Sequence, residues 1–138
     1  MNSIIFNDES YAHFRGNLMP QTNQSLGADL FAREDYVIPP GGFVLIKTGI
    51  TIEKAKGVYI EIRGRSSMFG HRIITNSSPI DLDYKNEIMV GLINLDRMQF
   101  IIRFQQRVAQ LIVLPMPGSW TNFRQQERVG GFGSTGEV

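Results

Sequence analysis

Side chains that bind phosphates or cations recur in short segments along this chain of 138 residues. Residues 27–31 (GADLF) place Asp29 between apolar neighbours at the start of an expected strand. A carboxylate there binds a cation directly or through water, although it also suits a turn in which it caps backbone N–H groups. Residues 64–67 (GRSS) combine backbone N–H groups, a guanidinium and two hydroxyls, which suits phosphate oxygens. The alternative is an ordinary polar loop with a serine capping a short helix.

Residues 76–87 (NSSPIDLDYKNE) hold two carboxylates two positions apart. On a strand Asp81 and Asp83 would share one face, and two like charges so close cost energy unless a cation, a base or a substrate needs them. Tyr84 would then point to the opposite face. The alternative is a polar hairpin with Asn86 in its turn.

Residues 106–112 (QRVAQLI) are an apolar strand pattern that carries polar side chains. Regular alternation places Arg107 and Gln110 on opposite faces of this strand. A buried glutamine needs hydrogen-bond partners, so we expect Gln110 to serve either a ligand or a subunit interface.

The tail contains a glycine-rich segment, residues 130–136 (GGFGSTG). It is similar to a loop that cradles phosphates, but it lacks the Lys-Ser/Thr element and the following helix of a P-loop. Phe132 stands alone between glycines, as a stacking group on a flexible backbone would. The alternative is a frayed terminus.

Short strands must position these segments, because the apolar residues recur with the period of a strand. Val58, Ile60 and Ile62 alternate with polar residues, which lets one side face a core. Further apolar patterns rich in β-branched residues, separated by Gly, Pro and Asn turn signals, cover residues 43–46, 50–53, 88–95, 98–104 and 108–114. This spacing predicts an all-β sandwich or barrel over residues 1–118, followed by a polar, flexible C-terminal arm over residues 119–138.

The composition excludes several classes of protein. A net charge of +1 gives no excess of basic charge for nucleic-acid binding, so we expect no nucleic-acid partner. The absence of cysteine excludes disulfide scaffolds and thiolate sites, and two histidines make a histidine-rich metal site improbable. No apolar run approaches the ~20 residues of a membrane span. No basic-then-apolar leader opens the chain, so we expect a cytoplasmic protein with no membrane partner, or one of the host-cell interior for a virus.

The order of the five segments resembles the five motifs of the trimeric dUTP pyrophosphatases (dUTPases). The resemblance runs from Ser25 to Gly136 and is most specific in the third and fifth segments. It implies a distorted jelly-roll β-barrel that forms a homotrimer, with active sites at subunit interfaces. The C-terminal arm of one subunit closes over the site of another. The implied reaction is hydrolysis of dUTP to dUMP and pyrophosphate with Mg²⁺.

The resemblance also implies roles for individual residues. Asp29 would hold Mg²⁺ through water, and Asp81 would orient the attacking water and contact the sugar 3′-hydroxyl. Tyr84 would pack on deoxyribose and exclude ribonucleotides, and Phe132 would stack on the base. The remaining substrate-binding residues would be Arg65, Ser66, Ser67, Asn76, Ile80, Gln110, Arg128, Gly133, Ser134 and Thr135, with Arg128 as a γ-phosphate ligand.

Three departures from the family pattern bear on function. Ser78 and Pro79 replace a glycine and an aliphatic residue, and proline removes a backbone N–H from a hairpin that reads uracil through its main chain. Asn86 replaces a glycine, and residues 105–106 (QQ) replace a glycine–acid turn.

Alternative functions therefore remain open at this point. The protein could be a pyrophosphatase for another deoxynucleoside triphosphate, such as dCTP or a modified pyrimidine nucleotide, or a non-hydrolytic nucleotide-binding regulatory relative. A dCTP deaminase and a structural jelly roll such as a capsid protein rank lower.

Overall fold

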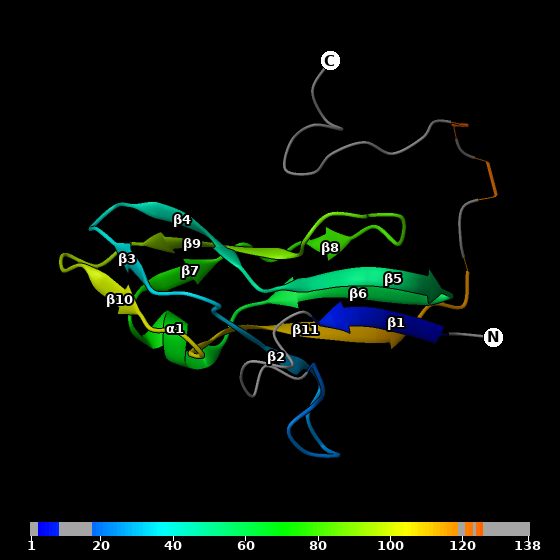
Figure 1. Cartoon of the computed structure of the whole chain (residues 1–138), viewed down its shortest axis with the longest axis horizontal. Helices are drawn as coiled ribbons and strands as arrows, with labels where there is room; N and C mark the ends of the chain where they lie inside the picture. The colour runs from blue at the N-terminus through cyan, green and yellow to red at the C-terminus, as the bar shows by residue number, and fades with distance from the viewer. Residues whose placement is uncertain (1–2, 9–17, 119–120, 123, 126–138) are drawn as a thin grey trace.

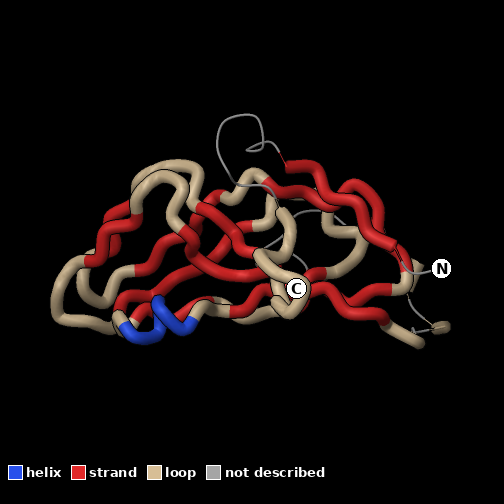
Figure 2. The backbone as a smooth tube through the Cα atoms, turned by 90° about the horizontal axis from the view of Figure 1, so that it is seen from below, coloured by secondary structure: helices blue, strands red, loops and turns tan. Residues whose placement is uncertain are grey.

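A computed structural model describes residues 3–8, 18–118, 121–122 and 124–125 of the chain (Figure 1). The part it describes is nearly all strand, with a single short helix at one edge (Figure 2). The all-β prediction is thus confirmed. Most of the predicted arm lies outside the described residues, and so do Arg128, Phe132, Gly133, Ser134 and Thr135.

The strands follow the apolar patterns of the sequence. In chain order they are β1 (Ser3–Asp8), β2 (Ala28–Phe31), β3 (Tyr36–Ile38), β4 (Phe43–Lys47), β5 (Ile50–Lys56), β6 (Val58–Arg63), β7 (Ile73–Thr75), β8 (Pro79–Ile80), β9 (Met89–Asn94), β10 (Phe100–Ile102) and β11 (Arg107–Pro115). The helix α1 (Ser66–Gly70) follows β6. The expected strand over residues 98–104 is shorter than predicted, because the turn after buried Asn94 extends to Met98, whose carbonyl accepts an Asn94 side-chain hydrogen bond.

Four antiparallel sheets build the part of the chain that the structure describes. The largest has the order β2-β11-β6-β8, and it carries most of the predicted site. A second sheet has the order β4-β9-β7, and the pairs β1-β5 and β10-β3 complete the set. Consecutive strands often belong to different sheets, as in a jelly roll, so segments distant in sequence meet.

The core lies between the sheets and is aliphatic. Val58, Ile60 and Ile62 of β6 are at most 5% exposed and point into it, as their alternation predicts. The side chains between them form a polar row instead, in which Tyr59 and Arg63 each donate a hydrogen bond to Glu61. No helix in the described part of the chain is long and apolar enough to cross a membrane.

Candidate active site

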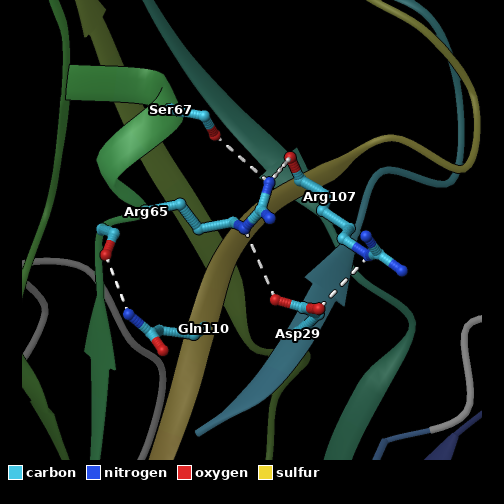
Figure 3. A network of polar contacts seen from close by, with 6 residues as sticks. Asp29, Arg65, Ser67, Arg107 and Gln110 are labelled. Atoms are coloured by element: carbon cyan, nitrogen blue, oxygen red, sulfur yellow. Dashed lines mark hydrogen bonds and ion pairs between the residues drawn. The ribbon is translucent and has the colours of Figure 1, made fainter. Parts of the chain in front are cut away.

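Strand pairing places Asp29 and Gln110 side by side. Asp29 of β2 is the register partner of Gln110 on β11, and Gln110 pairs on its other side with Arg63 of β6. The chain leaves β6 at Gly64 and enters α1, so Arg65 stands next to this pair of strands. Three segments that are far apart in sequence thereby meet, as Figure 3 shows.

Asp29 is the centre of a polar cluster. Its Oδ1 atom lies 3.4 Å from Nε of Arg65, and its Oδ2 atom lies 3.2 Å from Nε of Arg107 (Figure 3). The Asp29 side chain is only 20% exposed, which limits screening of these ion pairs by water. Two guanidinium groups on one carboxylate leave a net charge of +1, so the cluster attracts anions.

Arg107 is a member of this cluster that sequence reasoning misplaced. The prediction that Arg107 and Gln110 occupy opposite faces is wrong, because the register of β11 against β2 shifts between Arg107 and Ala109. The extra residue of this bulge resets the alternation and brings Arg107 to the Asp29 side. Its guanidinium also lies 5.9 Å from the centre of the Phe31 ring.

Arg65 is held by contacts beyond Asp29. Its Nη1 atom donates to Ser67 Oγ at 3.3 Å and lies 3.5 Å from the Arg107 carbonyl oxygen. Arg65 occupies the N-cap position of α1 and no side chain caps the helix, so the idea of a serine cap is wrong. Ser66 is instead the first helical residue, and it is exposed beside Arg65.

Gln110 has the partner that a half-buried amide requires. Its Nε2 atom donates to the Gly64 carbonyl at 3.0 Å, which joins β11 to the start of the phosphate-type segment (Figure 3). A Cβ atom at Gly27 would lie 3.0 Å from Gln110 Oε1 and from the Leu111 carbonyl oxygen. The glycine two residues before Asp29 is therefore needed for this close approach.

A pocket of about 180 Å³ gathers a second group of predicted residues. Its lining consists of Ile62, Asn76, Ser78, Pro79, Ile80, Asp81, Tyr84, Ile88 and Met89. Its lining includes the buried Tyr84 and the exposed Asp81. An aromatic ring and a carboxylate on one small pocket suit a sugar or base with hydroxyl or amide groups.

The segment around this pocket is not a regular strand. Only Pro79 and Ile80 pair with β6, opposite Glu61 and Ile60, and β8 is an edge strand in which proline is tolerated. The chain then turns, and the Tyr84 N–H donates to the Asp81 carbonyl at 3.1 Å.

The expectation that Asp81 and Asp83 share a strand face is therefore wrong, because both lie in a turn. The segment is not the polar hairpin of the alternative either, because β8 pairs with β6 and not with the following strand β9, although Asn86 does lie at a bend. In this turn the two carboxylates do not share a strand face, and both side chains are exposed to water, which weakens the repulsion between their charges.

The donor set near Asp29 suits a magnesium ion bound through its water shell better than one enclosed by protein ligands. No group of three metal-binding side chains occurs within the described ranges. Mg²⁺ commonly keeps several waters and uses one or two carboxylates together with substrate phosphates. A single partly exposed carboxylate beside an anion-attracting cluster meets that description.

The two groups of residues have no member in common. The pocket contains Asn76, Ile80, Asp81 and Tyr84, and its lining includes no member of the cluster of Asp29, Arg65, Ser67, Arg107 and Gln110. Each predicted site residue that the structure describes belongs to one group, except Ser66, which is exposed beside the cluster.

Comparison with known proteins gives a consistent result. The family model described as dUTPase matches residues 17–136. The deoxyuridine 5′-triphosphate nucleotidohydrolase of Nautilia profundicola is 39% identical over 125 residues, covering 85% of this chain and 88% of the relative. That of Maricaulis maris is 36% identical over 150 residues and covers 99% of both. The fold is similar to a mutant dUTPase of Staphylococcus aureus phage phi11 that coordinates a structural Mg(II) ion. That likeness has a TM-score of 0.69 at 19% identity, over 96% of this chain and 100% of the other.

Proposed function

Since this chain belongs to the dUTPase family and is accordingly a dUTP diphosphatase, we propose that it works by Mg²⁺-dependent attack of water on the α-phosphate. The products are dUMP and pyrophosphate. The observation that carries this mechanism is the pairing of a cationic cluster around Asp29 with a pocket that holds Asp81 and Tyr84. The first is suited to phosphates and the second to a nucleoside.

The cationic cluster is the expected binding site for the triphosphate. A nucleoside triphosphate carries roughly four negative charges, and burying them requires compensating cations. Arg65 and Arg107 supply two guanidinium groups that line one surface hollow together with Phe31, Gln105 and Gln106. Asp29 would hold a bound magnesium ion through water, and that ion would neutralise phosphate charge.

The pocket is the expected site for deoxyuridine. The Tyr84 ring forms its apolar wall and would pack on the sugar, leaving no room for a 2′-hydroxyl. Asn76 and Ile80 lie in the lining beside the expected base. Asp81 is exposed in the same lining, where its carboxylate can accept a proton from the attacking water and lower the barrier as a general base.

We assign the complete site to two subunits of a homotrimer, because the pocket lining of one chain includes no residue of its cationic cluster. An exposed apolar face on β4, β9 and β7 supports this assembly. Phe43 is 63% exposed and Ile93 is 41% exposed, and they are register partners on that face. A hollow on this face is lined by Phe43, Ile93 and Asn76, among others. Asn76 also lines the nucleoside pocket, so a second copy on the face would reach the pocket.

A subunit-mixing experiment tests the shared site. Asp81→Asn would disable the pocket and Arg65→Ala would disable the cluster, so each pure variant should be inactive. Unfolding and refolding the two together should restore part of the activity, since mixed trimers contain some sites with both groups intact. If mixtures stay inactive while light scattering shows trimers, the shared-site assignment is wrong.

The substrate is tested by pyrophosphate release from a panel of deoxy- and ribonucleoside triphosphates. We expect release from dUTP with Mg²⁺, its loss with EDTA, and a loss of at least 100-fold in Asp81→Asn. Faster turnover of dCTP or of a modified pyrimidine nucleotide would show that the enzyme prefers another base. This is the main alternative, because Ser78 and Pro79 lie in the pocket lining. Tight nucleotide binding without release from any substrate would indicate a regulatory relative.

A nucleotide substrate also implies that the protein acts where nucleotide pools exist, in the cytoplasm or the interior of an infected cell.

A further inference from the structure

The ring of Tyr84 is fixed by hydrogen bonds within its own loop. Its hydroxyl donates to the backbone carbonyl of Glu87 at 2.9 Å, and its N–H donates to the Asp81 carbonyl at 3.1 Å. The position of the phenol in the pocket therefore depends on where the Glu87 carbonyl lies. A displacement of that carbonyl would move the wall on which the sugar is expected to pack.

Glu87 is itself held by the turn between β4 and β5. Its Oε2 atom accepts the backbone N–H of Gly49 at 2.6 Å, a charge-assisted hydrogen bond. Gly49 has a φ of +75°, and a Cβ there would lie 2.6 Å from the Arg33 side chain, so the turn accepts only glycine without rearrangement. The N–H that Glu87 binds thus belongs to a turn whose conformation depends on glycine.

The neighbouring residue is anchored independently of the carboxylate. The Ile88 N–H donates to the Ile50 carbonyl at 2.8 Å, and the hydroxyl of Thr48 donates to the Ile88 carbonyl at 2.5 Å. Thr48 is 2% exposed, so these bonds are shielded from water. Removing the Glu87 carboxylate should leave the start of β9 in place and loosen only the loop that carries Tyr84.

We propose that Glu87 is a positioning residue that sets selectivity for deoxyribose over ribose, by fixing the carbonyl to which the Tyr84 hydroxyl is bound. This inference rests on the proposed function, because it concerns the sugar wall of the nucleoside pocket. The carboxylate acts as a hydrogen-bond acceptor for Gly49, so a neutral amide of the same length serves in its place.

The test compares kcat/KM for dUTP and for UTP across matched variants. Glu87→Ala should lower the dUTP-to-UTP ratio at least tenfold, through a higher KM for dUTP and detectable turnover of UTP. Glu87→Gln should keep the ratio within about threefold of the wild-type value, since its amide oxygen still accepts the Gly49 N–H. Glu53→Ala removes an exposed carboxylate of β5 and should change nothing.

Tyr84→Phe removes the next hydrogen bond of the chain, from the Tyr84 hydroxyl to the Glu87 backbone carbonyl, and keeps the ring. Its loss of selectivity should match that of Glu87→Ala, and the double variant should be no worse than the more severe single variant. This substitution also carries the test if thermal melting shows that Glu87→Ala is unfolded. If the losses of selectivity in the two single variants add up in the double variant, the inference about Glu87 is wrong. It is also wrong if the wild type prefers dUTP and Glu87→Ala leaves the dUTP-to-UTP ratio unchanged. Neither result affects the proposed function. A wild type that does not prefer dUTP overturns the proposed function and this inference with it.

Discussion

The Nε atom of Arg107 lies 3.2 Å from Oδ2 of Asp29 because β11 carries one residue more than β2 at this point. The bulge gives the cluster its second guanidinium, which regular pairing would have turned to the other face. The charge of the phosphate site thus depends on a backbone irregularity as well as on side-chain identity.

Asp29→Ala tests the centre of this cluster. The substitution leaves Arg65 and Arg107 without their shared carboxylate, so we expect kcat/KM for dUTP to fall at least 100-fold and the Mg²⁺ dependence to weaken. The stability cost should stay near 1 kcal/mol, since both guanidinium groups remain partly exposed to water. Steady-state kinetics over a Mg²⁺ series and urea unfolding measure the two effects. Unchanged kinetics would contradict the assignment of the cluster to phosphates.

Arg107→Gln tests the guanidinium that the bulge supplies. Loss of one phosphate-facing charge should raise KM for dUTP by about tenfold, the equivalent of ~1.4 kcal/mol, with a smaller change in kcat. Arg103→Gln is the matched control, because Arg103 is an exposed arginine of the turn before β11 and lies 3.9 Å from Asp35. An equal effect of both substitutions would show that only overall charge matters.

Gln105→Gly tests backbone strain next to the cluster. Gln105 has a φ of +72°, a left-handed conformation that costs roughly 1 kcal/mol for a residue with a side chain. Glycine at this position should raise the melting temperature by about 3 °C for a domain of this size. Gln106→Gly should lower it, because the Gln106 side chain accepts the Arg103 N–H at 3.0 Å. A lower melting temperature for Gln105→Gly would contradict the strain argument.

The tyrosine hydroxyl of Tyr36 provides a pH test. Burial is the main effect that raises its pKa above the ordinary value of 10.0, and a hydrogen bond to Glu34 adds to it. The N–H of Lys47 donates to the hydroxyl and opposes the rise. Because the folded pKa is the higher one, the stability from neutral Tyr36 is present below the unfolded pKa and is lost as pH rises through the folded pKa.

Alkaline difference spectra should therefore show a tyrosine component that ionises later than a free tyrosine, and Tyr36→Phe should reduce it. The remainder belongs to Tyr59, whose pKa is raised by its hydrogen bond to Glu61. Urea unfolding at pH values on both sides of the transition should show a steeper alkaline loss of stability in the wild type than in the variant. Identical alkaline profiles would contradict the burial argument.

Much of the fold could be predicted because alternation of apolar residues reports directly which side of a strand is buried. Val58, Ile60 and Ile62 illustrate this, since each points into the core as expected. The site was harder to predict where the backbone leaves regular geometry. Arg107 depends on a bulge, and Asp81 lies in a turn whose shape depends on hydrogen bonds to β6 and on the Tyr84 N–H.

The role of Glu87 carries no local signal, because its partner Gly49 is 38 positions away in the sequence. Only the tertiary fold brings that turn to the loop that carries Glu87. Types of residues and their order identified the chemistry, whereas contacts between distant segments decide which side chains take part in it.

Because of its two ion pairs, the Asp29 carboxylate competes with every incoming anion for the guanidinium groups of Arg65 and Arg107. A small anion such as inorganic phosphate gains little by displacing a carboxylate that already contacts the Nε atoms of both arginines. A longer polyanion offers more charge in one molecule and displaces it with greater gain. After hydrolysis, each product carries fewer phosphates than the substrate and competes less well with Asp29 for the two arginines. The ion pairs that disfavour small anions therefore also favour release of the products.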